Sequence, residues 1–248
     1  MGWTASLRIR NIWLMNTQPP TIISFVSPKG GVGKSTSCLA LAAALAHKGH
    51  QVQIIDFDQT ETLWRWYSTN ETARSHPNLT IEKGPDGDLG AFIKSVWSSR
   101  SGYVFIDLAG SLTNQMLLMA TFAHLTITPT KLNEPDVVEA NKLANQLKAI
   151  ATKIGKPITH RILVNDVPTH LLPAHQAHTL DQIDGSHLHR FDTLMHTRAA
   201  YPETFLTGTP PHFADRARAN IAKAVDEVDH LLAEVMVAIT EQEERVAA

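Results

Sequence analysis

Short apolar runs alternate with longer amphipathic segments along most of this chain. The runs are rich in β-branched and aromatic residues and end in polar or glycine-containing stretches, which is typical of fully buried strands. They cover residues 22–26, 52–55, 103–106, 125–128 and 161–164. Between them, residues 37–47 form a helix-favouring run, and residues 136–154 place apolar side chains three and four positions apart. Both segments are predicted to be helices.

Strands that alternate with helices predict an α/β fold of three layers, in which a mostly parallel, twisted sheet carries helices on both faces. In such folds ligands bind at the carboxyl ends of the strands. A last helix is predicted over residues 213–240, because its apolar positions recur every three or four residues. We expect this stripe to pack on the sheet, with a partner-helix surface as the alternative. It consists of Ile221, Val225, Val228, Leu232, Val235 and Ile239.

Length and composition agree with one domain. A chain of 248 residues with 43% hydrophobic and 19% charged residues is long enough for a single large α/β core. We place that domain at residues 21–240, after an N-terminal extension at 1–20 and before an acidic tail at 241–248. The extension is either a short arm or is not translated, with the true start at Met1 or Met15.

Composition also excludes several classes of protein. Cys38 is the only cysteine, which excludes an intramolecular disulfide and a site of clustered thiolates. No apolar run approaches the ~18 residues that a membrane-spanning helix needs. The chain from Asp226 onward holds seven acidic residues and one basic residue, and an anionic membrane surface would repel it.

A glycine-rich loop joins the first predicted strand to the first predicted helix. Residues 28–36 read Pro-Lys-Gly-Gly-Val-Gly-Lys-Ser-Thr, which fits the P-loop pattern when the first glycine position varies. Its glycines let backbone N–H groups turn toward phosphate oxygens, and the helix N-terminus adds partial positive charge. Lys34 can reach the terminal phosphates of ATP, and the Ser35 hydroxyl can hold Mg²⁺. The other nucleotide contacts are expected from Gly30, Gly31, Val32, Gly33 and Thr36.

Aspartates follow two other predicted strands. Asp107 directly follows the strand at 103–106, which is the Walker B arrangement for binding Mg²⁺ directly or through water. Asp56 and Asp58 follow the strand at 52–55. Phosphoryl transfer needs a water positioned beside Mg²⁺, and an acidic pair suits that task. The alternative for one of the pair is that it caps the start of a helix.

The string from Lys29 to Thr36 resembles the deviant Walker A motif of the ParA/MinD group of P-loop ATPases. The resemblance implies that Lys29 reaches across an ATP-bound homodimer to the partner's phosphates. It also implies that Asp58 orients or activates the attacking water and that Asp56 lies near the Mg²⁺ shell. The chain departs from the family at Asp58, which lacks the usual following proline, and after Asp107, where Ala109-Gly110 replaces two prolines.

The resemblance extends to the second half of the chain. Relatives place an asparagine after the strand at 161–164, so Asn165 is the candidate that contacts adenine, with turn capping as the alternative. The Arg198-x-x-Tyr201 segment resembles small ParA-like proteins, in which it lies near the nucleotide and the dimer surface. Iron–sulfur relatives are excluded, since they need paired cluster cysteines.

DNA binding is not visible in the overall charge, because the formal net charge is −2 and the pI is about 6.7. Non-specific binding needs only a local basic patch that releases counterions. ParA relatives carry DNA-contacting residues near the start of the final helix, and solvated surface charge is the alternative for each such residue here. The candidates are Arg190, Arg216, Arg218 and Lys223.

The sequence therefore predicts an ATP- and Mg²⁺-dependent dimerisation switch that binds DNA non-specifically and hydrolyses ATP slowly. Plasmid or chromosome partition, or DNA transfer, would be its task. A ParB-like protein or a relaxosome adaptor would stimulate it, and its location would be cytoplasmic and nucleoid-associated, without a membrane. Two alternatives are a membrane-cycling positioning ATPase of the MinD type and a metabolic P-loop ligase or kinase, such as the dethiobiotin synthetase relatives.

Overall fold

The computed structural model describes residues 19–99, 102–110 and 114–247. Residues 1–18, which make up most of the predicted N-terminal extension, lie outside this range. None of the helices in the described part of the chain combines the length and the apolar character needed to cross a bilayer.

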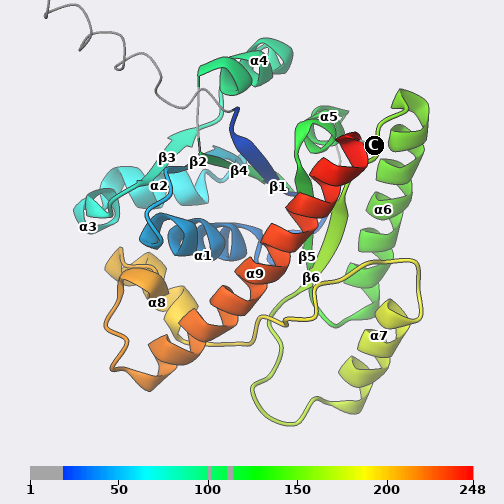
Figure 1. Cartoon of the computed structure of the whole chain (residues 1–248). Helices are drawn as coiled ribbons and strands as arrows, with labels where there is room; N and C mark the ends of the chain where they lie inside the picture. Colours follow the sequence, from blue (N-terminus) through cyan, green and yellow to red (C-terminus); the bar gives the residue numbers. More distant parts are fainter. Residues whose placement is uncertain (1–18, 100–101, 111–113, 248) are drawn as a thin grey trace, which may run out of the picture.

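A single sheet of six strands, all parallel, lies at the centre of the described molecule (Figure 1). Across the sheet the order is β3-β2-β4-β1-β5-β6. Five of the strands lie at the predicted runs, and β3 is an addition to them. The strands are β1 (Thr21–Phe25), β2 (Val52–Phe57), β3 (Leu79–Lys83), β4 (Tyr103–Leu108), β5 (Leu125–Thr130) and β6 (His160–Val164).

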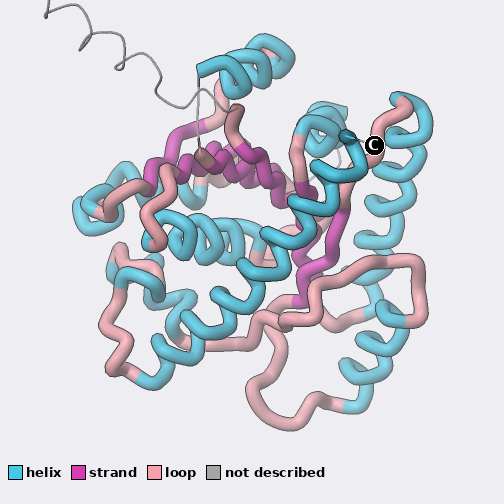
Figure 2. The backbone as a smooth tube through the Cα atoms, in the orientation of Figure 1, coloured by secondary structure: helices cyan, strands magenta, loops and turns pink. Residues whose placement is uncertain are grey.

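Helices cover both faces of this sheet (Figure 2), which confirms the predicted three-layer α/β fold. On one side lie α1 (Lys34–His47), α2 (Thr62–Thr69), α3 (Glu71–Ser75) and α9 (Ala219–Ala247). On the other lie α4 (Leu89–Ser99), α5 (Asn114–Phe122) and α6 (Glu134–Ile154). The remaining elements are α7 (Ala174–Asp184), α8 (Ala200–Thr207) and a short 3₁₀ turn, η1 (Pro211–Phe213).

Alternation along the central strands divides the core between the two faces. Ile23 and Phe25 pack toward α1 and α9, whereas Ile22 packs toward α4, α5 and α6. A parallel strand that is buried on both faces has no polar side, and this explains why the runs are continuously apolar.

The structure corrects the end of one predicted strand. Pro129 does not close β5, which continues through it to Thr130. Thr126 donates its N–H toward β6, at Thr159 O, so the nitrogen of Pro129 faces the β1 side. Pairing with β1 ends at Ile127, so no ladder bond is lost at the proline.

The final helix also differs from its prediction. It begins at Ala219 rather than at residue 213, because η1 and a turn come first, in which Asp215 accepts the N–H of Ala217 through its carboxylate. It continues to Ala247, through most of the predicted acidic tail, and Gln242 there donates to Pro157 O. The predicted apolar stripe is buried, as expected for packing on the sheet.

One segment without regular secondary structure extends the sheet beyond β6. Residues 189–197 run alongside β6 and exchange backbone hydrogen bonds with it, including Phe191 N–H to Ile162 O and Met195 N–H to Val164 O. Isolated parallel bridges join Ile162 to Arg190 and Val167 to His196. This edge segment, residues 189–197, has no apolar run or turn signal, and the sequence did not reveal it.

His160 makes the stability of this edge dependent on pH. Burial, with the charges of Arg161 and His189, lowers the pKa of His160 to about 4, and its Nε2 lies 2.8 Å from Thr128 Oγ1. As pH falls, His160 is protonated in the unfolded chain before it is protonated in the folded protein, and this favours unfolding. The contribution of neutral His160 to the free energy of unfolding is therefore complete above the unfolded pKa of 6.5 and is lost as pH falls toward 4. We expect wild type to lose about 2 kcal/mol of unfolding free energy between pH 7.5 and pH 5 from this group.

Urea unfolding at the two pH values tests this prediction, with His160→Gln as the comparison. Glutamine retains a polar partner for Thr128 and does not titrate, so the pH-dependent loss should be smaller in the variant by the same amount. Parallel pH profiles for the two proteins would show that His160 does not carry the effect.

Candidate functional site

The P-loop connects β1 to α1 at the carboxyl edge of the sheet. Gly31 and Gly33 adopt φ values of 73° and 90°, which L side chains rarely tolerate. A Cβ on Gly33 would also lie 2.6 Å from the Asn165 amide nitrogen, so this glycine is required on two counts. The helix begins at Lys34 rather than at residue 37, which places Lys34, Ser35 and Thr36 in the first turn, where backbone N–H groups are free for phosphate.

Asp107 and Ser35 form the part of the site that fits Mg²⁺. Asp107 lies one residue before the end of β4 and is fully buried, and its Oδ2 accepts a hydrogen bond of 2.6 Å from Ser35 Oγ. Its Oδ1 is buried without a partner. Burial raises the pKa of Asp107 to about 7, although the Ser35 bond opposes this. An unpartnered carboxylate oxygen beside a hydroxyl is the oxygen-ligand environment that Mg²⁺ takes in nucleotide sites.

Asp56 has a different environment from Asp107. Its Oδ1 accepts the N–H of Asp58, and its Oδ2 accepts the N–H groups of Leu63 and Trp64, all at 3.0 Å. The last two belong to the first turn of α2, so Asp56 caps that helix from the end of β2. Asp56 therefore caps α2, as the alternative held, and its predicted place near the Mg²⁺ shell stays a prediction.

Asp58 lies just beyond β2 and is partly exposed. Its Oδ1 accepts hydrogen bonds from the N–H and the hydroxyl of Thr60, at 2.9 and 2.8 Å. These local bonds hold the carboxylate at the carboxyl edge of the sheet without burying it.

The Lys29 side chain pairs with Asp136, in the first turn of α6. Its Nζ lies 3.5 Å from Asp136 Oδ1, and 41% of its side chain is exposed. Asp136 is held in turn by Asn133, the N-cap of α6, through bonds in both directions. Lys34, by contrast, is buried, with its Nζ 3.5 Å from Lys29 O. The two lysines of the loop are thus separated, one inside the site and one at its rim.

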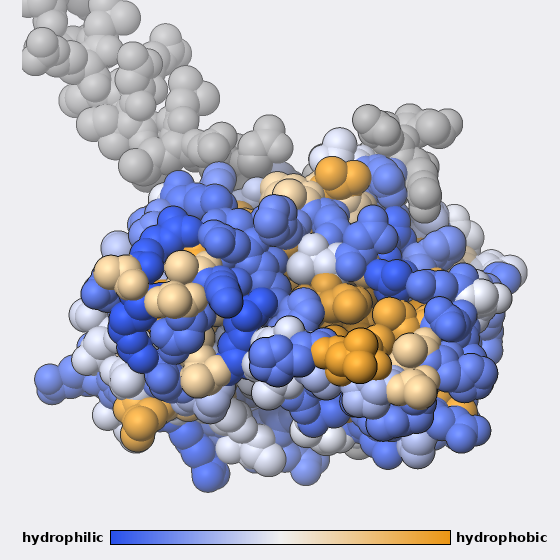
Figure 3. All heavy atoms as spheres, turned by 90° about the horizontal axis from the view of Figure 1, so that it is seen from below, coloured by the Kyte–Doolittle hydropathy of each residue, from blue (hydrophilic) through white to orange (hydrophobic). Residues whose placement is uncertain are grey.

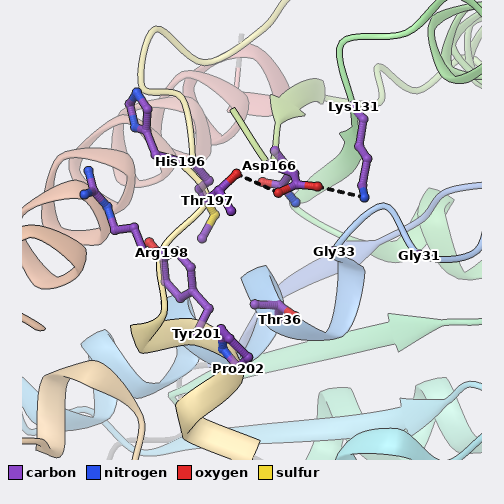
Figure 4. Close-up of a pocket in the computed structure, with 12 residues that line it drawn as sticks. Gly31, Gly33, Thr36, Lys131, Asp166, His196, Thr197, Arg198, Tyr201 and Pro202 are labelled. Atoms are coloured by element: carbon purple, nitrogen blue, oxygen red, sulfur yellow. Dashed lines mark hydrogen bonds and ion pairs between the residues drawn. The ribbon is translucent and has the colours of Figure 1, made fainter. Parts of the chain in front are cut away.

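A cavity of about 290 Å³ opens beside the P-loop (Figure 4). Asn165, at the end of β6, donates to Val32 O at 3.0 Å and leaves its Oδ1 buried without a partner, free to accept from an amino group such as that of adenine. Asp166 bridges Lys131 and Thr197 at 2.9 and 2.7 Å (Figure 4). The structure thus brings Asn165 to the P-loop, and its contact with adenine stays a prediction.

Several lining residues were missed by the sequence analysis. The edge segment supplies Met195, His196 and Thr197, and the predicted Arg198 and Tyr201 follow it. The sequence signal that could have revealed their anchor is a line of glutamates in α9, spaced seven residues apart beside the apolar stripe. They are Glu227, Glu234 and Glu241.

The four predicted DNA-binding residues differ in how far their side chains are exposed to a ligand. Arg190 is 19% exposed and forms a two-pronged ion pair with Asp184, so it holds the fold together. Arg216 and Arg218 lie in the turn before α9 rather than in its first turn, and are about half exposed. Lys223 is exposed on α9.

The fold and the loop define a P-loop nucleotide-binding protein. The chain belongs to the CobQ/CobB/MinD/ParA nucleotide-binding domain family, whose model matches residues 23–208. It is similar to the ParA protein of Rhizobium radiobacter, with 24% identity over 229 residues, which cover 89% of this chain and 98% of that protein. Members of this ParA/MinD group are ATPases.

Two solved structures share the fold. A plasmid partition protein of Borrelia burgdorferi B31 bound to AMPPNP matches with a TM-score of 0.64 and 17% identity, covering 87% of this chain and 99% of that one. MinD of Pyrococcus horikoshii OT3 in complex with Mg-ADP matches with a TM-score of 0.63 and 17% identity, covering 87% and 96%.

Proposed function

We propose that this protein is a switch that dimerises with ATP, binds DNA non-specifically and hydrolyses ATP slowly, in partition or transfer of DNA. The observation that carries the proposal is the division of the P-loop lysines: Lys34 is buried at its own site, while Lys29 is exposed at the rim. A lysine at the rim can serve a second subunit's nucleotide after it leaves Asp136.

The chain's own groups have distinct tasks in this mechanism. The first turn of α1 and Lys34 bind the phosphates, and the Asn165 amide accepts from the base. Ser35 and Asp107 would hold Mg²⁺, which neutralises developing charge on the phosphates when bound. Asp58 is partly exposed and orients a water at the same edge of the sheet, while Asp56 keeps its loop in place.

Exposed apolar surface supports dimerisation. Leu171, in the stretch between β6 and α7, is 92% exposed. Figure 3 shows hydrophobic residues gathered on the face seen from below, surrounded by hydrophilic ones. Exposed apolar surface of this kind marks interaction sites. A second copy of the chain, facing the first across the nucleotide, would cover it.

DNA would bind at the start of α9, where Arg216, Arg218 and Lys223 lie. Replacing all three with alanine should reduce the slope of log affinity against log salt by about 3, because each lost phosphate contact releases about one counterion fewer. The matched control replaces three exposed lysines in or just after α6, on the other side of the molecule in Figure 1: Lys148, Lys153 and Lys156. Fluorescence anisotropy over a salt series measures both.

An unchanged slope in the α9 variant, or an equal reduction in the control, would remove this surface from the proposal. Arg190 is left intact in these variants because its loss would break the ion pair with Asp184.

A ParB-like protein or a relaxosome adaptor is the proposed stimulating partner, and the proposed location is cytoplasmic and nucleoid-associated.

A membrane-cycling switch of the MinD type is the second candidate, because the MinD structure shares this fold. Sedimentation with anionic liposomes in the presence of ATP distinguishes the two functions. We expect no ATP-dependent binding to liposomes, since an anionic surface would repel the acidic residues from Asp226 onward.

A further inference from the structure

The edge segment, residues 189–197, is held on two sides. Its backbone bonds to β6 on one side. On the other, Glu234 of α9 accepts the N–H groups of Asp192 and Thr193 and the Thr193 hydroxyl, at 2.6, 2.9 and 2.5 Å. A segment with no helix or strand of its own therefore depends on side chains from α9 for its position.

Glu227 holds the end of this segment most tightly. Only 5% of its side chain is exposed. Its Oε1 accepts from the His196 N–H at 3.0 Å and from the Tyr201 hydroxyl at 2.7 Å. Its Oε2 accepts from His196 Nδ1 at 2.5 Å and from the Arg198 guanidinium at 2.7 and 3.1 Å. One buried carboxylate thus fixes both a backbone and three side chains.

The residues that carry these donors line the cavity beside the P-loop. Figure 4 shows His196 and Arg198 turned away from the P-loop glycines, while Thr197 turns the other way, to Asp166. Tyr201 itself lines the cavity, and burial together with the nearby Glu227 carboxylate raises its pKa, so the hydroxyl remains a donor. The wall of the cavity opposite the P-loop is therefore set by Glu227.

We propose that Glu227 is a positioning residue for the base end of the nucleotide site. It acts through His196, Arg198 and Tyr201 and does not touch the nucleotide. The phosphate end is built separately, by the backbone and side chains of α1's first turn, and does not depend on it. This inference rests on the proposed function, because it assumes that a nucleotide occupies the cavity.

The separation of the two ends supplies the test. Inorganic tripolyphosphate with Mg²⁺ probes the P-loop alone, whereas ATP probes both ends. In Glu227→Gln the charge that pairs with Arg198 is lost, and we expect ATP affinity to fall about tenfold while tripolyphosphate affinity stays unchanged. Tyr201→Phe removes one donor without altering the packing of the ring, and should lower ATP affinity by a smaller factor.

The matched control is Glu234→Gln, on the same helix and the same segment, because its partner Thr193 does not line the cavity. Calorimetric titration with ATP, and displacement of ATP by tripolyphosphate, measure the affinities. An equal loss for both ligands, an unchanged ATP affinity, or an equal effect of Glu234→Gln would overturn the assignment. Failure of wild type to bind ATP would instead refute the proposed function.

Discussion

Replacement of Lys29 with alanine is expected to lower ATP turnover on the order of 10²-fold, the usual effect of removing one preorganised donor to a developing charge. ATP binding to the monomer should change little, because Lys34 and the first turn of α1 serve the phosphates of their own subunit. Without Lys29, the phosphates bound by the partner subunit lose a neighbouring positive charge, and ATP should no longer promote dimerisation. Turnover and sedimentation velocity with ATP measure the two effects.

The control for this experiment is Lys142→Ala, an exposed lysine on α6 that pairs only with Glu139 among its described contacts. It removes the same charge away from the site and should leave both quantities as in wild type. If Lys29→Ala hydrolysed ATP at the wild-type rate, Lys29 of one subunit would not serve the nucleotide of the other, and the dimer model would be wrong.

Replacement of Asp58 with alanine should have the second-largest effect. We expect hydrolysis to fall on the order of 10²-fold while ATP binding is retained, because the lost group orients water rather than phosphate. The ATP-bound dimer should then accumulate, together with its DNA complex. Asp56 keeps the loop folded in this variant, since its three backbone bonds do not involve the Asp58 side chain.

Asp86→Ala is the matched control, because Asp86 is an almost fully exposed aspartate outside the site, near Lys83. Single-turnover hydrolysis and size-exclusion chromatography with ATP are the measurements. Rapid hydrolysis by Asp58→Ala would remove Asp58 from the water-positioning role, and loss of ATP binding would show that it supports the loop instead.

Most of the fold could be predicted because its signals lie within short stretches of the sequence. Each of the five apolar runs that were predicted as strands between residues 22 and 164 marks a strand of the sheet. The P-loop spacing is contained in nine residues. Pro129 predicts the wrong end for β5, because the missing N–H of a proline matters only where a neighbouring strand would accept it. Whether one is there depends on where the pairing with β1 ends.

The features that the sequence did not reveal depend on contacts between residues distant in sequence. Asp56 and Asp107 both follow apolar runs, and only the position of α2 shows that Asp56 is already used by backbone N–H groups. Glu227 counts in the sequence as one more charge in an acidic region. That Glu227 is buried becomes clear only from the fold, in which the edge segment lies between β6 and α9.

Co-sedimentation of the purified protein with DNA, in ADP, ATP or a non-hydrolysable ATP analogue, tests the central claim most directly. At low salt we expect binding with ATP or the analogue and none with ADP, and we expect binding to weaken at moderate salt as counterions compete. Binding that is equal in all nucleotide states, or absent from all of them, would contradict an ATP-controlled switch that acts on DNA.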